Sequence, residues 1–395
     1  MKKILFLGAP VFQIPIIEDA KKMGLYVGVV DIDSDAPAKP YADKVYEASI
    51  IDYEQILEIA KDFKPDGIIC GACDTSVVTC AKVCETLGLP GNSVESAIKS
   101  TDKLEMLKAF EKNAVPHPKF QFVDKTAIKD FELEIPYPVI AKPVDSAGGR
   151  GINFIENEKE LVDKICDSSK EGKNGNVLVE EYMEGPEVSV EVIVCDGVPH
   201  VLQITDKITS GEPYFYEIGH SQPSDLADDI KSQITKTAEA ACMAVGLVNS
   251  PAHVEIKVTD EGPKLVELGA RMGGDCITTY LINASILGVS MSEEAIRISL
   301  GEKRSLGEYR ESGIYSAVKF IPSCTGTLKK VIVDQNMDKE NVLDIHISVT
   351  QGTNYSDARD DTGRFGYVVA KGSSRQEALE RCQNIIDAIK FVVDK

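Results

Sequence analysis

The sequence predicts an α/β protein whose N-terminal part is a doubly wound parallel sheet. Within residues 1–100, short apolar runs alternate with amphipathic segments in a βαβαβ order. This order is typical of a parallel sheet with helices on both faces. The chain has 395 residues, enough for two or three domains, and its 43% hydrophobic and 27% charged residues are ordinary for a globular protein.

The first hundred residues contain three predicted strands and three predicted helices. In a sheet of this kind, ligand sites lie at the carboxyl ends of the strands. The first strand runs into Gly8-Ala9-Pro10 and not into a G-x-G-x-x-G turn, so a dinucleotide site is weakly supported, although Asp31 ends the second strand. The strands are Lys3–Leu7, Tyr26–Asp31 and Gly67–Cys70, and the helices are Ile14–Met23, Tyr53–Phe63 and Ser76–Leu87.

Charge and cysteine content narrow the class of protein. A net charge of −20 speaks against a nucleic-acid or anionic-membrane surface, and an anionic substrate would need a locally basic pocket. We expect no membrane span, and the apolar residues 4–17 contain two prolines and lack a cleavage signal, so we expect no signal peptide. Ten cysteines without a disulfide-like framework predict a cytoplasmic protein.

Four of the cysteines are spaced C-x2-C-x6-C-x3-C, at Cys70, Cys73, Cys80 and Cys84. This spacing allows a zinc site. The alternative is core packing, because Cys70 ends a buried strand, Cys84 lies on the inner face of a helix, and a free cysteine behaves as a small hydrophobe. We favour core packing.

A glycine-rich segment follows the next helix and strand. Thr101 or Asp102 caps a helix that ends near Asn113, before two prolines, and Tyr137–Lys142 is a strand. The strand leads into PVDSAGGRG, Pro143–Gly151, whose backbone amides are able to approach a phosphate closely, with Lys142 as a point charge beside it. The alternative is a tight hairpin turn between residues 139–142 and 152–155. We favour phosphate binding.

Carboxylates cluster where the next two strands, Asn176–Met183 and Val188–Val194, are connected. They are suited to accept hydrogen bonds from ribose hydroxyls or an exocyclic amine, although acidic turns are often only solvated. Beyond them, Thr205–Gly219 is polar with three aromatic residues and is predicted to be a substrate-facing loop, and Ser224–Val245 is predicted to be a helix. The carboxylates are Glu180, Glu181, Glu184 and Glu187.

The segment His253–Gly274 predicts a β-hairpin. Its strands, His253–Val258 and Lys264–Gly269, flank a Thr-Asp-Glu-Gly-Pro loop. With that loop Val258 pairs with Lys264, and the ladder places Glu255 opposite Glu267. The side chains expected on the core face are Val254, Ile256, Val266 and Leu268.

Two carboxylates that face each other across a ladder repel unless a cation lies between them. Oxygen-only ligands suit a hard cation, and Mg²⁺ commonly binds through one or two carboxylates plus substrate phosphates. Arg271 adds a fixed positive charge at the same strand end. Glu255 and Glu267 are therefore predicted metal ligands, and the alternative is an exposed strand face with incidental glutamates.

The composition shifts again near residue 301. We expect a helix at Ser292–Leu300, and the remaining residues predict three strands and a long helix. The predicted domains are residues 1–100, 101–300 and 301–395. The strands are Gly313–Phe320, Asn341–Val349 and Arg364–Lys371, and the helix is Ser374–Val393, capped by Ser373 or Ser374.

Taken together, these motifs resemble the ATP-grasp superfamily over nearly the full chain. The matching segments are TDK at 101–103, VIAKPVDSAGGRG at 139–151, VLVEEYMEGPEVSVE at 177–191 and HVEI…LVELGARMGG at 253–274. Residues 1–100 resemble the pre-ATP-grasp domain of purine-biosynthetic ligases and biotin carboxylase. The resemblance implies a two-lobed α+β ATP-grasp domain, with a lid at roughly residues 115–185, and a C-terminal α+β subdomain.

The resemblance also implies a role for each matching residue. Two lysines would contact the α and β phosphates of ATP, and a glycine loop would close over the triphosphate. Two glutamates would bind Mg²⁺, or Mn²⁺ in its place, and Arg271 would hold the substrate carboxylate or its acyl phosphate. The implied residues are Lys103 and Lys142 for phosphate, Gly148, Gly149 and Gly151 for the loop, Glu180 with the backbone of Glu181 and Met183 for adenine, Glu187 for ribose, Glu255 and Glu267 for metal, and Arg271 with Lys142 for catalysis.

One position departs from the common E-x-N-x-R pattern, because Gly269 offers no side-chain ligand to a second metal ion. The E-x-G-A-R form looks more like the L-amino acid ligase branch, as do Gly219-His220 and Pro223-Ser224. That branch implies an ATP-dependent ligase that joins a small-molecule carboxylate to an amine, with amino acids as candidates, and a homodimer. His220 and Lys207 are candidates for the acceptor pocket or ordinary surface residues. The alternatives are a carbamoyl-phosphate-synthase-like or carboxylating enzyme, and a nucleotide-binding protein without turnover.

Overall fold

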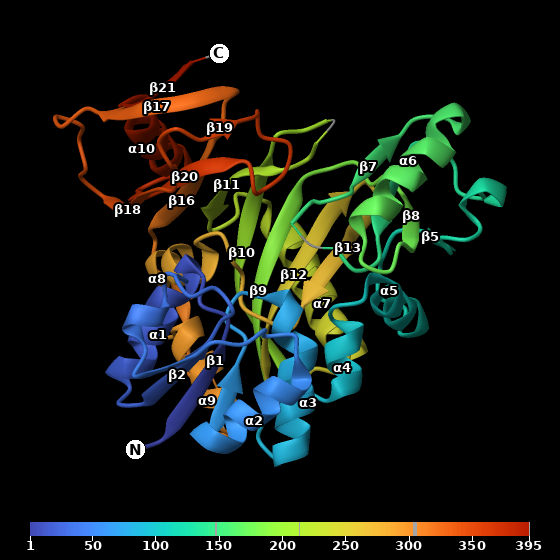
Figure 1. The fold of residues 1–395 in the computed structure, drawn as a ribbon. Coiled ribbons are helices and arrows are strands. Elements are labelled where there is room, and N and C mark those ends of the chain that lie inside the picture. Colours follow the sequence, from blue (N-terminus) through green and yellow to red (C-terminus); the bar gives the residue numbers. More distant parts are fainter. Residues whose placement is uncertain (147, 213, 303–305, 395) are drawn as a thin grey trace.

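The structure, a computed structural model, describes residues 1–146, 148–212, 214–302 and 306–394 (Figure 1). A blue N-terminal sheet lies below a long green-to-yellow central sheet, and a smaller green sheet with one helix projects to the upper right (Figure 1). The orange-to-red C-terminal residues form the upper left (Figure 1). No helix among the described residues is long and apolar enough to span a membrane.

The N-terminal sheet confirms the predicted doubly wound arrangement, with four parallel strands in the order β3-β2-β1-β4. Alternate residues of β1 enter two separate cores: Leu5 packs with α2 and α3, whereas Phe6 packs with α1 and α9. The short β3 and α4 were not predicted, because so few residues carry no usable periodicity. The elements are β1 (Lys3–Leu7), β2 (Tyr26–Val30), β3 (Lys44–Tyr46), β4 (Gly67–Ile69), α1 (Ile14–Lys22), α2 (Tyr53–Phe63), α3 (Val77–Leu87), α4 (Val94–Lys99) and α9 (Met291–Ser299).

Helix α9 joins the N-terminal sheet to the central sheet. It packs on β4 of the first sheet and on β9 and β12 of the second. Gly67 allows this approach, because a Cβ there would lie 2.2 Å from the carbonyl oxygen of Ser299. This contact lies at the amino end of β4, and beyond its carboxyl end the N–H of Met272 donates to the carbonyl oxygen of Gly71 at 3.2 Å.

The central sheet has eight antiparallel strands in the order β13-β12-β9-β10-β11-β16-β20-β18. Helix α7 covers one of its faces, and α10 packs on β16 and β20. The last three strands in this order come from the predicted C-terminal subdomain, so hydrogen bonds continue across residue 300. The elements are β9 (Glu187–Cys195), β10 (Val198–Thr209), β11 (Glu217–Gln222), β12 (Ser250–Thr259), β13 (Gly262–Gly269), β16 (Tyr315–Pro322), β18 (Val342–Ile347), β20 (Arg364–Gly372), α7 (Asp228–Ala244) and α10 (Arg375–Asp387).

Two predictions for this region were wrong. The segment Thr205–Gly219 is not one loop, because β10 continues to Thr209 and β11 begins at Glu217. Lys207 and Glu217 on these strands are largely buried and face a site, so their polarity was misread as a loop signal; Pro213 lies outside the described residues. The helix predicted to reach Val393 ends at Asp387, since the apolar, β-branched run after it forms β21 (Ile389–Asp394) and pairs with β17 (Gly326–Val333).

The projecting sheet has the order β5-β8-β6-β7 and lies within the residues predicted to form a lid. Helix α6 packs on β6 and β7 and closes a small core of its own. We call this unit the lid sheet. Its elements are β5 (Phe120–Val123), β6 (Val139–Pro143), β7 (Asn153–Ile155), β8 (Val177–Glu181) and α6 (Glu158–Glu171). The other α-helices and strands of the described residues are α5 (Lys103–Lys112), α8 (Ile282–Ser285), β14 (Ile286–Leu287), β15 (Arg310–Glu311) and β19 (Asn354–Tyr355).

In the β12–β13 hairpin, Glu255 pairs with Glu267 as predicted, but the loop and the register around this pair differ from the prediction. Thr259 pairs with Gly262, so the loop is shorter than predicted, and Val258 pairs with Pro263 and not with Lys264. A β-bulge between the pairs of Glu255 and Ile256 then restores the register. Because of the bulge, Leu265 is buried in the core and Val266 is only partly buried, so the core prediction for Val266 was wrong.

Candidate functional site

Lys103, Lys142, Glu267 and the glycine loop meet around a small cavity of about 40 Å³. Lys103 is the first residue of α5, and Asp102 caps this helix by accepting hydrogen bonds from two of its N–H groups. The Lys103 Nζ lies 2.6 Å from Glu267 Oε1 and donates to the carbonyl oxygen of Ser146 at 2.8 Å. Burial lowers the pKa of Lys103, but the Glu267 carboxylate outweighs it and the net shift is upward.

The glycine loop forms the predicted hairpin connection and lies where phosphate binding is predicted. It connects the antiparallel pair β6 and β7, as a hairpin turn would, and it also covers the lysine-lined cavity. Gly148, Gly149 and Gly151 have φ of +68°, +72° and +77°, which other residues rarely adopt. At Gly151 a Cβ would also lie 2.8 Å from Pro143. Ala147 of this loop lies outside the described residues.

Lys142 and Glu180 form a buried ion pair at the base of the lid sheet. The Lys142 Nζ is 2.8 Å from Glu180 Oε2, and each side chain is 6% exposed. The other oxygen, Glu180 Oε1, is buried without a hydrogen-bond partner among the described residues. A buried unpaired acceptor needs a donor, and an exocyclic amine would supply one. Glu181 instead pairs with Lys264 at 2.6 Å, and Met183 follows in the connection to β9.

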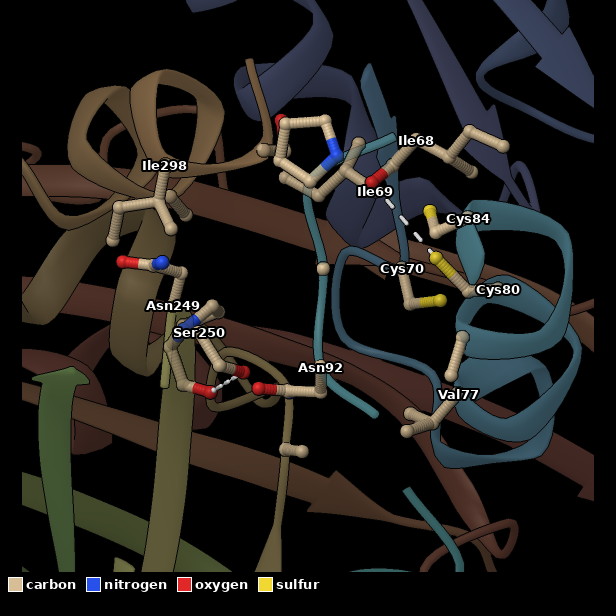
Figure 2. A pocket seen from close by; sticks show the side chains of 17 residues that line it. Ile68, Ile69, Cys70, Val77, Cys80, Cys84, Asn92, Asn249, Ser250 and Ile298 are labelled. Atoms are coloured by element: carbon tan, nitrogen blue, oxygen red, sulfur yellow. Dashed lines mark hydrogen bonds between the residues drawn. The ribbon is translucent and has the colours of Figure 1, made fainter. Parts of the chain in front are cut away.

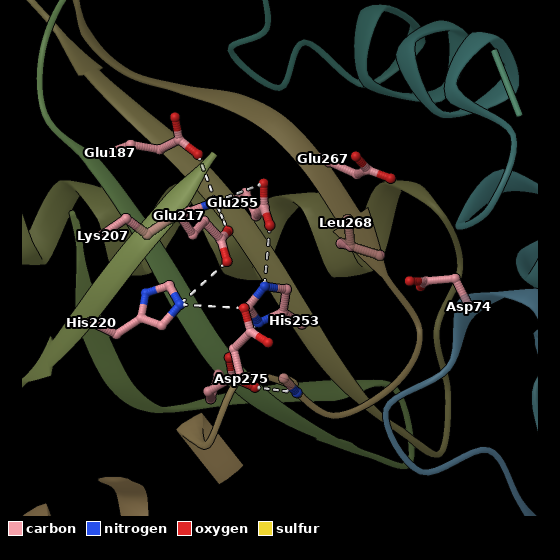
Figure 3. A network of polar contacts seen from close by, with 12 residues as sticks. Asp74, Glu187, Lys207, Glu217, His220, His253, Glu255, Glu267, Leu268 and Asp275 are labelled. Atoms are coloured by element: carbon pink, nitrogen blue, oxygen red, sulfur yellow. Dashed lines mark hydrogen bonds and ion pairs between the residues drawn. The ribbon is translucent and has the colours of Figure 1, made fainter. Parts of the chain in front are cut away.

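Lys207 on β10 is surrounded by carboxylates (Figure 3). Its Nζ lies 2.7 Å from Glu187, 2.8 Å from Glu217 and 3.2 Å from Glu255, and its side chain is 4% exposed. Burial lowers the pKa of Lys207, but the three carboxylates together raise it well above the ordinary value. The alternative of a surface lysine is therefore wrong. Lys207 links the predicted ribose carboxylate to a predicted metal carboxylate.

The paired glutamates of the hairpin each contact a protein cation. Glu267 contacts Lys103, and Glu255 contacts Lys207 and also lies 3.3 Å from His253 Nε2. His253 Nδ1 donates to the fully buried Glu191, whose other oxygen accepts from the N–H of Gly273 at 3.0 Å. Burial lowers the pKa of His253, but Glu191 outweighs it and raises the pKa to about 9. The donor set of two facing carboxylates fits Mg²⁺, with phosphate and water as further ligands.

Arg271, just past the end of β13, contacts the N-terminal domain through a residue that the sequence did not reveal. Its Nε and Nη2 donate to the two oxygens of Asp74, each at 3.0 Å. Burial raises the pKa of Asp74, but Arg271 outweighs it and the net shift is downward. The available signal was the position of Asp74 shortly after the parallel strand β4, where ligand sites are expected.

A second polar group, of which the sequence indicated only His220, lies beside Lys207 (Figure 3). His220 Nε2 is 3.3 Å from Glu217 and 3.8 Å from Asp275, and Arg364 is 2.8 Å from Asp275 and 2.7 Å from Asp361. Among the described residues, Glu217, His220 and Asp275 are the one group of three whose ligand atoms lie close enough for a shared metal ion. Arg364 and Lys207 already neutralise these carboxylates. His220 is 1% exposed, so the surface alternative is wrong for it too.

The cysteines predicted to pack in the core lie around a second small cavity (Figure 2). Cys70, Cys80 and Cys84 line it together with apolar side chains such as Val77. The neighbouring thiols and burial raise the pKa of Cys80 well above its ordinary value, which disfavours a thiolate. Cys73 is not among the lining residues, and its Sγ lies 3.0 Å from Thr75 Oγ1. The geometry therefore favours core packing over four converging zinc ligands.

Comparison with known proteins gives two family matches. Residues 135–279 match the ATP-grasp domain, and residues 319–394 match the L-amino acid ligase C-terminal domain 2. Alanine–anticapsin ligase of Bacillus subtilis is 31% identical over 247 residues, which are 56% of this chain and 51% of that protein. Carnosine synthase 1 of Gallus gallus is 26% identical over 330 residues, which are 76% of this chain and 35% of that protein.

The fold resembles solved structures over the whole chain. The L-amino acid ligase from Bacillus licheniformis superposes with a TM-score of 0.86 at 21% identity, covering 100% of this chain and 99% of the other. At this identity the likeness shows the fold alone. The chain spans about half the length of alanine–anticapsin ligase and about a third of carnosine synthase 1.

Proposed function

Because the chain contains an ATP-grasp domain and an L-amino acid ligase C-terminal domain, we propose that it is an ADP-forming carboxylate–amine ligase. It activates a small-molecule carboxylate with ATP and couples it to an amine. The match to the L-amino acid ligase C-terminal domain indicates amino acids as the substrates. The observation that carries the proposal is the meeting of Lys103, Lys142, the glycine loop and Glu267 around one cavity, with Glu255 paired to Glu267.

The proposed nucleotide site runs from the lid sheet to the hairpin. Glu180, through its unpaired Oε1, accepts from the adenine amine, beside the backbone of Glu181 and Met183. Glu187 accepts from the ribose hydroxyls, and Lys207 holds it in place at 2.7 Å. The phosphates lie between the lysines and the amides of the glycine loop. This order of contacts supports binding of a whole nucleoside triphosphate and not of phosphate alone.

Glu255 and Glu267 are the residues that would hold Mg²⁺. When bound, Mg²⁺ supplies positive charge that neutralises the phosphate oxygens during phosphoryl transfer. The protein's own contribution is orientation, since His253 and Lys207 hold Glu255, and Lys103 holds Glu267. Glu191 fixes the ring of His253 in turn. Gly269 adds no further ligand.

The reaction needs ATP because a carboxylate has a poor leaving group and does not react directly with an amine. A carboxylate oxygen attacks the γ-phosphorus, the bond to ADP breaks, and an acyl phosphate forms. The neutral amine then attacks the carbonyl carbon, the bond from that carbon to the phosphate oxygen breaks, and the departing phosphate takes the amine proton, which completes the C–N bond. Arg271 holds the carboxylate in line for the first step, and Asp74 fixes the plane of its guanidinium. The glycine loop excludes water that would otherwise hydrolyse the acyl phosphate.

His220 is proposed to stabilise negative charge near the reacting groups. Burial lowers the pKa of His220, but Asp275 and Glu217 outweigh it and the net shift is upward. The upward shift favours the protonated form of the imidazole, which is a hydrogen-bond donor.

The test is ADP release with Mg²⁺ and ATP across amino acids offered singly and in pairs, with mass spectrometry of each mixture. We expect ADP only with particular pairs, together with a product lighter than their sum by one water. Glu267→Gln is the control that should abolish both signals. ADP formation that requires bicarbonate, or tight ATP binding without ADP under any pair, would contradict the proposed ligase and favour a carboxylating enzyme or a non-catalytic binder.

Small-molecule carboxylates and amines are the partners that this proposal requires. A homodimer and a cytoplasmic location stay predictions. Sedimentation of the purified chain measures the first, and fractionation of cells measures the second.

A further inference from the structure

A larger cavity, about 540 Å³, lies between the C-terminal strands, the turn after β1 and the glycine loop. The N-terminal turn supplies Val11 and Phe12, β18 supplies His346, and β20 supplies Arg364 and Tyr367. Gly148 and Arg150 of the glycine loop line it as well, so the cavity borders the proposed triphosphate site. Asp275, a few residues after Arg271, lines it too. The cavity therefore adjoins the reaction centre without being part of the nucleotide site.

Three rings that line this cavity form a stacked wall, with Tyr367 between Phe12 and His346. The rings of Phe12 and Tyr367 have centroids 5.8 Å apart and planes 28° apart, and those of His346 and Tyr367 are 5.2 Å and 27° apart. The Tyr367 hydroxyl donates to Asp344 at 3.0 Å, and Tyr280 donates to the same carboxylate at 2.8 Å. These contacts fix the central ring, so the wall has its shape before a ligand arrives.

The charged residues on the other side largely neutralise one another. Arg364 binds both Asp275 and Asp361, and its guanidinium lies 3.7 Å above the ring centroid of Phe320. A ligand thus meets the edges of the stacked rings, together with charged groups of both signs that pair with each other. Aromatic rings pack well against such edges, because edge-to-face ring contacts add to the burial of area.

We propose that this cavity binds an aromatic side chain of one of the two joined molecules, that is, of an aromatic amino acid. The inference rests on the proposed ligase function and adds the substrate class. With the ring against Phe12 and His346, the main-chain groups of the amino acid extend towards Asp275, Arg271 and the glycine loop. The cavity volume lies in the range of pockets that enclose whole small molecules, so even a two-ring side chain has room.

Binding and turnover test the inference separately. The binding experiment titrates tryptophan, phenylalanine and alanine into the full chain with Mg²⁺ and a non-hydrolysable ATP analogue. We expect the aromatic amino acids to bind about tenfold or more tightly than alanine, because each ring contact and its buried area favour them. In Phe12→Ala, the ratio of the affinity for aromatic amino acids to that for alanine should fall about tenfold. In Phe12→Leu, which keeps an apolar side chain, this ratio should fall by less.

His346→Ala is a second variant for the case in which changes at Phe12 disturb folding. Phe122→Ala is the matched control, since Phe122 lies on β5 of the lid sheet, is 41% exposed and does not line the cavity. We expect the control to bind all three amino acids as the unchanged protein does.

Turnover separates this inference from the proposed function. With ADP release as the readout, the kcat/KM of Phe12→Ala should fall about tenfold for an aromatic partner and stay nearly unchanged for alanine. Ligation that proceeds without any aromatic preference, or an equal loss for all partners, would overturn the inference and leave the ligase standing. Selective aromatic binding without ADP under any pair would support the cavity and overturn the ligase. Equal binding of alanine and tryptophan would overturn the cavity assignment by itself.

Discussion

Arg271 and Asp74 lie 197 residues apart in the chain and form a two-point ion pair, with both N···O distances at 3.0 Å. A third donor of Arg271, Nη1, binds the carbonyl oxygen of Met272 at 3.1 Å. The guanidinium is thus held in one plane, with N–H groups of Nη1 and Nη2 left for a substrate carboxylate. The pair also connects the metal hairpin to the N-terminal sheet.

Asp74→Asn removes the charge and keeps the size of the side chain. We expect kcat to fall about tenfold or more, because Arg271 loses its fixed plane, while the KM for ATP changes little. The free energy of unfolding should fall by about 1–3 kcal/mol. Steady-state ADP release and denaturant unfolding measure the two effects.

The control for Asp74 is Asp167→Asn, which changes a 57% exposed carboxylate on α6 that pairs with Lys170. It should alter neither quantity. An unchanged kcat in Asp74→Asn would show that the pair does not position Arg271 for the reaction.

The hairpin offers a three-way comparison of glutamates. Glu255→Gln and Glu267→Gln should each lower turnover by about a hundredfold or more and raise the Mg²⁺ concentration needed, because the metal site loses a charge. Glu261→Gln, in the loop of the same hairpin and 77% exposed, should behave as the unchanged protein does. ADP release over a Mg²⁺ titration is the measurement. Near-normal activity in Glu267→Gln would remove the metal assignment.

Lys142 and Glu180 have separable effects on stability and catalysis. Lys142→Ala should lower the free energy of unfolding by about 3 kcal/mol, since it leaves a buried carboxylate unpaired, and should also raise the KM for ATP. The double variant Lys142→Ala, Glu180→Gln should recover much of the stability and none of the activity.

Lys264→Ala is the matched control for Lys142, because Lys264 pairs with the neighbouring Glu181 at 2.6 Å in a more exposed setting. It should cost about 1 kcal/mol or less and leave the KM for ATP unchanged. Equal effects of the two lysine changes on KM would argue against phosphate binding by Lys142.

Asp361 gives the protein a defined pH dependence. Burial, with the nearby Glu217, raises the pKa of Asp361 to about 6 in the folded state, against 3.8 for an ordinary aspartate. The protonated form is therefore the one that folding favours, so this stabilisation is full below about pH 4 and is lost as pH rises through about 6. The total change is about 3 kcal/mol at most.

Asp361→Asn removes this titration. We expect the free energy of unfolding of the unchanged protein to fall, compared with that of Asp361→Asn, as pH rises from about 4 to about 6. Above about pH 6 the difference between the two proteins should stay constant. Asp357→Asn, an exposed carboxylate in the same loop, should show the pH profile of the unchanged protein. Parallel unfolding profiles for Asp361→Asn and the unchanged protein would rule out a raised pKa.

Cys73→Ser tests the two interpretations of the cysteine spacing. We expect full activity and no bound zinc in either protein, because Cys73 lies outside the cavity lined by Cys70, Cys80 and Cys84. Metal analysis of the purified chain and ADP release are the measurements. Loss of both zinc and activity in the variant would restore the zinc site.

Much of the fold was predictable because its signals are local. Asp102 caps α5 and Ser374 caps α10, as their side-chain chemistry predicts. The prediction that Glu255 pairs with Glu267 assumed a loop that is too long and no β-bulge. These two errors cancelled in the register, so the predicted pair is correct. Among the missed elements, β3 and α4 have three and six residues, too few for a period to stand out, whereas α6, with 14 residues, was overlooked despite its length.

The sequence by itself determined the doubly wound sheet, the glycine loop and the glutamate hairpin, since each depends on periodicity, glycine or charge within one segment. Only the tertiary structure placed Asp74 on Arg271, Lys207 among three carboxylates, and Phe12 against Tyr367. These partners come from segments far apart in the chain. A pattern within one segment shows which face of a helix or strand is buried, but it does not specify which distant side chain that face contacts.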